Sequence, residues 1–283
     1  MTTRYITIIL LLFGLSGLAR AQKLLPGKPM VKNYRPLTYG GGLQNWAIVQ
    51  DKRGVMFIGN RFGVLKYDGI RWNLIELEKK TIGRSMAIDS SGTVYVGGQG
   101  EFGYLDRDSI GELQYRPLWK SLPKEVHGFE DVWRIHVTSN GIVFSTVRAV
   151  FVLEKQTGQF KVIKPTEEQN LFDRAYFCNN TLFIQEIGKG LLKWENDRLE
   201  MLPGGERFVS EQVKEILPYG GEGLLILTFS KGAFLYQEGR IIPWETSASE
   251  YARQNLIYSA IQLNDGTYVV GTSERGVGKF DQE

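Results

Sequence analysis

Alternating apolar and polar residues return as a repeated pattern from about residue 45 to the last residue of the chain. In the clearest copy, residues 45–69, an alternating strand leads to a polar turn that ends at Gly54, and a second strand rich in β-branched and aromatic residues follows. A short glycine-bearing loop leads to a third strand, closed by Asp68 and Gly69. One such unit cannot bury its apolar face alone, so the pattern predicts an array of stacked units.

Six copies of this unit align on the turn between their first two strands. Successive turn residues are 38, 49, 39, 43 and 43 positions apart, close to the roughly 40–50-residue blade of a β-propeller. β-Branched and aromatic residues dominate and glycine recurs often, which disfavours helix. We predict an all-β fold, a β-propeller of about six four-stranded blades, with an incomplete seven-bladed propeller as the alternative. The turn residues are Gly54, Gly92, Gly141, Asn180, Gly223 and Gly266.

The first residues of the chain do not follow the repeat. Arg4 precedes an apolar run over residues 6–18, and residues 19–21 form an A-x-A cleavage site. The run is shorter than the roughly 20 residues that span a bilayer, which favours a cleaved signal peptide over a membrane anchor. We therefore expect a periplasmic or secreted protein with no membrane span after signal removal. The expected division is a signal peptide at 1–21, an N-terminal segment at 22–42 and propeller repeats at 43–283.

Charge and the scarcity of reactive residues exclude several classes of function. The chain has 34 basic and 31 acidic residues without a basic tract of five or more, so we expect no direct contact with nucleic acid. With two histidines and no P-loop, HExxH or CxxC motif, we expect no cofactor and no metal site. His136 alternates with apolar residues, which favours a structural role. The single cysteine, Cys178, is expected to be a buried or half-buried strand thiol.

Three glutamates, Glu101, Glu186 and Glu274, fall at comparable loop positions in three repeats. Paired carboxylates can hydrolyse glycosides. Solvation of the loops is the alternative interpretation, because glutamate is mostly exposed in folded proteins. A secreted carbohydrate-active enzyme, a lyase or glycosidase, is therefore an alternative to a protein without enzymatic activity.

Loops from every blade of a propeller converge at one end of the central channel, so residues far apart in sequence meet there. Arginines with a few tryptophans in these loops suit a carbohydrate or another small anionic ligand, because arginine presents paired donors and indole faces stack on sugars. Alternatively, Trp46 and Trp133 begin inner strands and pack between blades. The candidate ligand-binding residues are Trp46, Arg61, Arg84, Glu101, Trp133, Arg148, Arg174, Glu186 and Arg275.

The first two repeats carry a family resemblance. NWAIVQD at 45–51, GVLKYDG at 63–69 and YVGGQGEFGYL at 95–105 resemble two-component-regulator propeller repeats, found in the periplasmic sensor region of Bacteroidetes-type regulators. In that family the propellers are usually followed by a triple-tyrosine domain, a membrane helix, and a histidine kinase or LuxR-like output domain. The resemblance implies ligand sensing, often of an oligosaccharide, without catalysis in the propeller, and a homodimer in the full-length receptor.

The sixth copy stops directly after its third strand. The resemblance therefore predicts an N-terminal fragment of a longer sensor that lacks the membrane and output domains. Alternatively, residues 31–34 pair as the missing outer strand and close a six-bladed ring, which removes exposed sheet edges. A protein-interaction scaffold is a further alternative, because propeller faces often bind partners.

Overall fold

The strands form six antiparallel sheets within residues 31–281, the part of the chain that the computed structural model describes. Residues 36–283 make one structural unit, separate from residues 1–35. Residues 31–35 contain neither helix nor strand, and the predicted signal peptide lies outside the described residues. Each sheet consists of strands that follow one another in sequence, which is the predicted arrangement of propeller blades.

Five of the six sheets described over residues 31–281 have four strands, and the sixth has three. Blades 1 to 3 are β1 (Asn45–Gln50), β2 (Met56–Asn60), β3 (Gly63–Tyr67) and β4 (Trp72–Ile75); β5 (Ser85–Ile88), β6 (Val94–Gly97), β7 (Phe102–Arg107) and β8 (Leu113–Pro117); and β9 (Arg134–Val137), β10 (Gly141–Ser145), β11 (Val150–Glu154) and β12 (Phe160–Ile163). Blades 4 to 6 are β13 (Phe172–Cys178), β14 (Thr181–Glu186), β15 (Gly190–Glu195) and β16 (Arg198–Met201); β17 (Val213–Tyr219), β18 (Gly223–Thr228), β19 (Ala233–Gln237) and β20 (Arg240–Pro243); and β21 (Ile257–Gln262), β22 (Tyr268–Thr272) and β23 (Val277–Phe280).

The tight turns between the first two strands of a blade form for the predicted reason. Gly54, Gly92 and Gly266 have φ values of 87°, 90° and 84°, in the left-handed region that glycine adopts without strain. An aspartate opens the turn in blades 1 and 2. The Asp89 carboxylate, for example, accepts hydrogen bonds from the Ser91 and Thr93 backbone amides at 2.9 Å. These local bonds set the register of the hairpin that follows.

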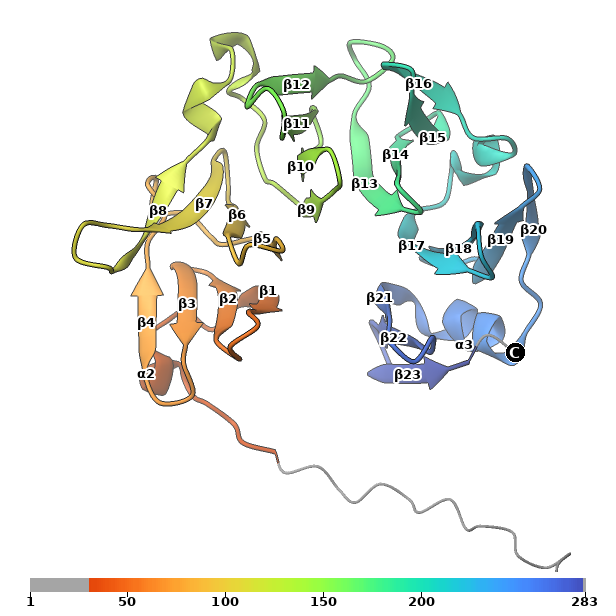
Figure 1. Cartoon of the computed structure of the whole chain (residues 1–283). Coiled ribbons are helices and arrows are strands. Elements are labelled where there is room, and N and C mark those ends of the chain that lie inside the picture. The colour runs from red at the N-terminus through yellow and green to blue at the C-terminus, as the bar shows by residue number, and fades with distance from the viewer. Residues whose placement is uncertain (1–30, 282–283) are drawn as a thin grey trace, which may run out of the picture. The chain divides into compact units, whose positions relative to one another are not determined.

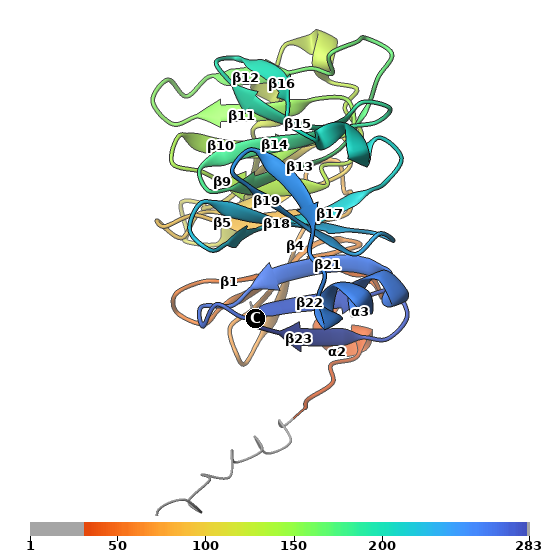
Figure 2. The same ribbon diagram turned by 90° about the vertical axis from the view of Figure 1, so that its right-hand side faces the viewer.

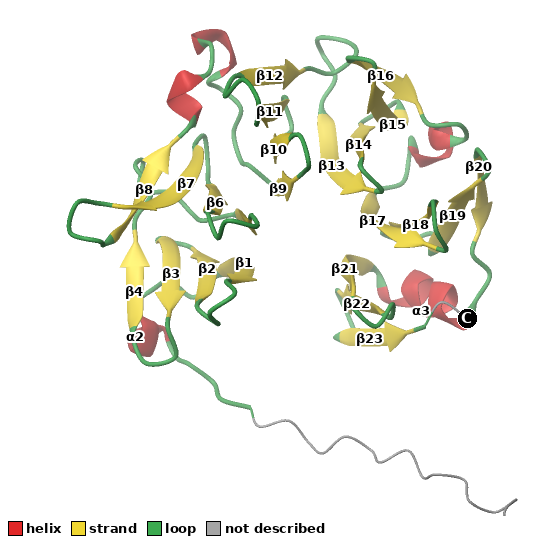
Figure 3. Ribbon diagram, in the orientation of Figure 1, coloured by secondary structure: helices red, strands yellow, loops and turns green. Residues whose placement is uncertain are grey.

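Helical segments are short; one precedes blade 1 and the others lie in connections between blades. They lie toward the outside of the ring rather than at its centre (Figure 3). In the connection from blade 5 to blade 6, the Thr246 side chain caps the helix by accepting a hydrogen bond from the Ser249 amide at 3.2 Å (α3 in Figure 2). The segments are α2 (Pro36–Tyr39), η1 (Trp119–Ser121), η2 (Lys124–Val126), η3 (Gly205–Phe208) and α3 (Ser247–Asn255).

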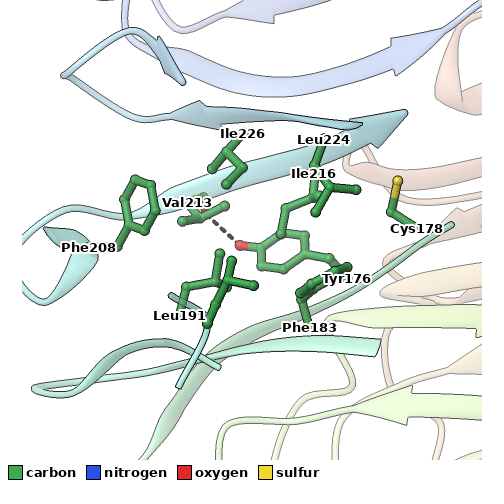
Figure 4. Packing of buried hydrophobic residues seen from close by; sticks show 10 residues of the cluster. Tyr176, Cys178, Phe183, Leu191, Phe208, Val213, Ile216, Leu224 and Ile226 are labelled. Atoms are coloured by element: carbon green, nitrogen blue, oxygen red, sulfur yellow. Dashed lines mark hydrogen bonds between the residues drawn. The ribbon is translucent and has the colours of Figure 1, made fainter. Parts of the chain in front are cut away.

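The apolar core is divided among the interfaces between successive blades. One buried cluster lies at each of the five interfaces from blade 1 to blade 6 of the described chain. Between blades 4 and 5, Tyr176 and Phe183 pack against Ile216 and Ile226 (Figure 4). The Tyr176 hydroxyl donates a 2.5 Å hydrogen bond to the Val213 carbonyl within this cluster. Stacked blades therefore bury the faces that no single blade could bury.

The inner strands of successive blades lie side by side around the centre of the unit formed by residues 36–283, as expected for a six-bladed β-propeller (Figure 1). The ring is open between blade 1 and blade 6 (Figure 1). Blade 6 has the three strands that its copy of the repeat predicts, and β23, which pairs with β22, forms the outer edge of this described sheet. Residues 31–34, the alternative outer strand, form no strand.

Candidate functional site

At or just before the start of each inner strand, one residue lies on the side of the ring where successive blades connect, and in four blades it lies at an irregularity in the strand pairing. The pairing of β1, β13, β17 and β21 with its neighbour shifts register around Trp46, Asp173, Lys214 and Tyr258 respectively. Such bulges re-aim side chains and often occur beside functional sites. The equivalent residues of blades 2 and 3 precede β5 and β9. We call the set the rim residues: Trp46, Arg84, Trp133, Asp173, Lys214 and Tyr258.

Three of the predicted ligand-binding residues meet in the rim. The guanidinium carbon of Arg84 lies 4.2 Å from the ring centroid of Trp46 and 4.7 Å from that of Trp133. Arg84 also forms an ion pair with Asp131 at 3.3 Å. Trp46 and Trp133 are 38% and 36% exposed, so packing between blades does not bury them completely. The result is an arginine held between two indole rings that still offer surface to a ligand.

Arg148 adjoins this cluster through the neighbouring acidic residue. Its guanidinium forms a 2.8 Å ion pair with Glu130, which precedes Asp131 in sequence. Arg148 also lines a cavity of about 320 Å³ together with Lys164 and Asn170. Because both members of the Arg148–Glu130 pair are exposed, solvent weakens their attraction and the arginine can exchange partners.

A second basic group lies on the inner strands of blades 3 to 5. The Nη1 atom of Arg134 on β9 donates to both carboxylate oxygens of Glu215 on β17, at 2.7 and 2.8 Å, and the guanidinium lies 5.1 Å from the ring centroid of Tyr176 on the intervening β13. The pKa of Lys214 is lowered by burial and by the positive charges of Arg174 and Arg134. A buried lysine beside two arginines is a favourable place for an anion, which would relieve their mutual repulsion.

Two predicted site residues instead hold the blades together. Glu101 and Glu186 are fully buried. The Glu101 carboxylate accepts hydrogen bonds from the Thr81 hydroxyl at 2.7 Å and the Lys79 amide at 3.1 Å. The Glu186 carboxylate accepts two from Thr166, at 2.6 and 3.1 Å. Each glutamate thus anchors the loop that follows the outer strand of the preceding blade, so we leave both out of the candidate site.

The remaining predicted arginines lie apart from the Trp46–Arg84–Trp133 cluster or on its edge. Arg61 is exposed in the turn between β2 and β3, and Arg275 is exposed between β22 and β23. Arg174 lies on β13 near Lys214 and is half-buried. The structure therefore divides the expected ring of arginines into an aromatic cluster, a basic group on blades 3 to 5, and two exposed turn residues.

Within the described residues, the side chains that could bind a metal ion or act as a nucleophile do not gather at one place. Among residues 31–281, no three His, Cys, Asp or Glu side chains come together in a way that could hold a metal ion. Cys178 is buried and not in a disulfide, as expected for a strand thiol. His136 contacts the Ala175 carbonyl at 2.9 Å through its Nε2, in agreement with the predicted structural role. In the described chain, no helix is long and apolar enough to cross a membrane.

Several rim residues were missed because single loops, rather than the aligned copies, were searched for arginine and tryptophan. Trp46, Arg84, Trp133 and Tyr258 each stand eight residues before the turn glycine of their copy. Lys214 stands nine residues before Gly223, and Asp173 stands seven residues before Asn180, the turn residue of its copy. This nearly constant offset is the sequence signal that would have found the whole set. Arg134 and Glu215 follow the rim residues Trp133 and Lys214 directly.

Comparison with known proteins supports the fold. No family model matches the sequence, and no curated protein matches it. The structure is similar to the extracellular domain of a Bacteroides thetaiotaomicron protein assigned as a hybrid two-component system, with a TM-score of 0.61, 17% identity, and coverage of 84% of this chain and 32% of that chain. A second such domain from the same organism gives a TM-score of 0.52 and 13% identity, covering 84% and 40%.

A different class of protein shares the architecture to a similar degree. Virginiamycin B lyase from Staphylococcus aureus gives a TM-score of 0.57 and 10% identity over 84% of each chain. At these identities the similarities show a common fold. The present chain spans about a third of the length of the first two-component structure, whose coverage is 32%. Extracellular domains assigned to two-component systems and a lyase are thus both similar in fold to this chain.

Proposed function

We propose that this chain is the exported, ligand-binding propeller of a two-component or LuxR-type regulator and that it binds its ligand at the rim. The observation that carries the proposal is the stacking of Arg84 between the Trp46 and Trp133 rings, both partly exposed. Exposed indole faces beside a fixed guanidinium suit the apolar faces and polar groups of a sugar. The structural likeness to extracellular two-component domains supports the same assignment.

The charge around the centre of the ring favours an acidic saccharide. The rim residues and the residues that follow them on the inner strands include four bases, Arg84, Arg134, Arg174 and Lys214, and two acids, Asp173 and Glu215. Arg134 is bound to Glu215 and Arg84 to Asp131. Arg174 and Lys214 are therefore the cations best placed to receive a carboxylate or sulfate group from the ligand.

Binding should be tested with a panel of neutral and acidic oligosaccharides, followed by calorimetry on the best ligand. Trp46→Ala and Trp133→Ala should each weaken binding about tenfold, because one stacking contact contributes roughly 1–2 kcal/mol. Trp72→Ala is the matched control, since Trp72 lies on the outer strand of blade 1 and stacks on Tyr67. Binding that is lost equally in the control, or unchanged in both test variants, would contradict the proposed site.

The enzymatic alternative, a lyase or glycosidase, finds little support in the placement of Glu101 and Glu186. Glu101 and Glu186 are buried and hydrogen-bonded to the loops that they fasten. Proton transfer to a glycosidic oxygen requires a carboxyl group within reach of the substrate. Incubation of the protein with the oligosaccharide that binds best, followed by chromatography of the products, separates the two assignments. Cleavage of the ligand would overturn the non-enzymatic proposal.

A further inference from the structure

The end of blade 3 beside the rim carries two basic cavities that the rim residues do not line. Cavities of about 320 and about 160 Å³ share Arg148 and Lys164 in their walls. Both side chains are exposed, and no acidic side chain within residues 31–281 forms an ion pair with Lys164. Glu168 lines the larger cavity and Glu125 the smaller, so each cavity also offers an acceptor for a hydroxyl group.

The strand pairing of blade 3 places these cavities next to Trp133. The Trp133 amide donates a 2.8 Å hydrogen bond to the carbonyl of Ser145, the last residue of β10, and Arg148 lies in the turn that follows. Lys164 directly follows β12, whose last residue pairs with the first residue of β11, so it lies beside the same turn. The four strands from β9 to β12 span three strand spacings, roughly 14 Å. The path from Trp133 to Lys164 therefore runs outward along one end of blade 3.

Two adjacent acidic residues connect the cavities with the rim. Asp131 forms the ion pair with Arg84, and Glu130 forms the ion pair with Arg148. The Glu130 backbone has a φ of 64°, a left-handed conformation that is unfavourable for a residue with a side chain, and the Gly100 amide donates a 2.6 Å hydrogen bond to its carbonyl. Backbone strain of this kind is concentrated at ligand sites and persists only where the surrounding structure holds it. Both arginines are therefore oriented from one fixed point of the fold.

The two ion pairs differ in how readily a ligand can replace the acidic partner. The side chains of Arg84 and Asp131 are 11% and 17% exposed, whereas those of Arg148 and Glu130 are 56% and 57% exposed. Attraction between exposed charges is weak, so an anionic group of a ligand can take the place of Glu130 at Arg148. Lys164 lines the same cavities and adds a second positive charge for that group.

We propose that Arg148 and Lys164 form an outer subsite for a second anionic group, a carboxylate or sulfate, of the ligand bound at the rim. The proposal rests on the proposed rim site and adds the length and charge of the ligand. A single sugar ring cannot reach from Trp133 to Lys164, so the ligand is an oligosaccharide with acidic groups on separate sugars. Glu130 competes with this ligand for Arg148 and thereby lowers its affinity.

Calorimetry with the acidic oligosaccharide that binds best, and with its acidic monosaccharide unit, tests the outer subsite. Arg148→Gln and Lys164→Gln should each weaken binding of the oligosaccharide by roughly fivefold and leave binding of the monosaccharide unchanged. Glu130→Gln should strengthen binding of the oligosaccharide about twofold to fivefold, because the competing charge is removed. Lys155→Gln is the matched control and should change neither, since Lys155 is exposed in the turn between β11 and β12, at the opposite end of blade 3.

The outcomes separate this subsite from the rim. If Trp46→Ala weakens binding while Lys164→Gln has no effect, or if Glu130→Gln weakens binding, the outer subsite is refuted and the rim site stands. If no acidic oligosaccharide binds, the rim proposal fails, and titration with sodium sulfate, followed through the backbone amide NMR signals of Ala149 and Lys164, decides on the subsite alone. A saturable shift that Lys164→Gln removes and Glu130→Gln enlarges supports the anion site, and the absence of such a shift overturns it.

Discussion

The His136 side chain is neutral in the folded protein at neutral pH, and we therefore predict that the propeller loses stability in mild acid. Burial, and to a lesser extent the positive charge of Arg134, lowers the pKa of His136 from 6.5 to about 4, although the contact with the Ala175 carbonyl acts in the opposite direction. A carbonyl oxygen can only accept, so the Nε2 atom of the neutral ring carries the proton. The unfolded chain binds a second proton near pH 6.5, whereas the folded protein resists it until about pH 4.

The sign and size of the effect follow from this difference. Between these two pH values the unfolded state holds more protons, so stability is fully present above pH 6.5 and falls as the pH decreases toward 4. At 1.36 kcal/mol per pKa unit, the upper limit is about 3.4 kcal/mol. Because the side chain is half-buried and lines a cavity of about 500 Å³, solvent reduces the penalty. We expect about 2 kcal/mol.

Urea unfolding between about pH 7.5 and about pH 4.5 measures the effect. His136→Gln keeps an N–H donor for Ala175 but cannot be protonated, so its free energy of unfolding should decline less than that of the wild type. His127→Gln, in the connection between blades 2 and 3, is the matched control and should decline as the wild type does. Hydrogen bonds from the backbone amides of Arg71 and Ile70 hold the pKa of Asp68 below 3.8, so carboxylates of this kind titrate below this pH range. A His136→Gln variant as acid-sensitive as the wild type would refute the reasoning.

Three further outcomes are expected. Tyr176→Phe should lower the free energy of unfolding by about 1–3 kcal/mol in urea titrations, because the buried Val213 carbonyl loses its donor. Glu186→Gln should destabilise by a similar amount, since an amide cannot accept at both oxygens as the carboxylate does from Thr166; an unchanged midpoint would contradict its structural role. Burial raises the pKa of the Cys178 thiol to about 12, so a thiol reagent near pH 8 should react only after unfolding.

Much of the fold was predictable because it depends on local signals. Turn glycines such as Gly54 and Gly92 mark the hairpins, and the alternation of apolar residues between them determines which face of each strand is buried. The predicted fourth strand of a blade is present in blade 1 as β4. The open side of the ring was harder to predict from the sequence, because the exposure of Ile48 depends on which blade lies beside it rather than on its own neighbours in sequence.

The site was predicted only in part, for the same physical reason. Trp46, Arg84 and Trp133 were identified because their residue types suit a ligand, and their equivalent places on three successive blades bring them together. Glu101 has an equally suitable type, but its burial is decided by Thr81 in the loop from the preceding blade. Long-range contacts of this kind leave no trace in the pattern around Glu101 itself.

The bonds made by Arg84 and Arg134 also affect how the repeats cooperate. Arrays of repeats are usually described by couplings between nearest neighbours alone. Arg84 of blade 2 follows this description, since it contacts Trp46 of blade 1 and Trp133 of blade 3, whereas Arg134 links blade 3 directly with Glu215 of blade 5. The nearest-neighbour contacts of Arg84 join blades 1 to 3, and the second-neighbour ion pair of Arg134 joins blades 3 to 5, so two cooperative groups overlap at blade 3. Blade 3 belongs to both, so its unfolding uncouples the two halves of the propeller from each other.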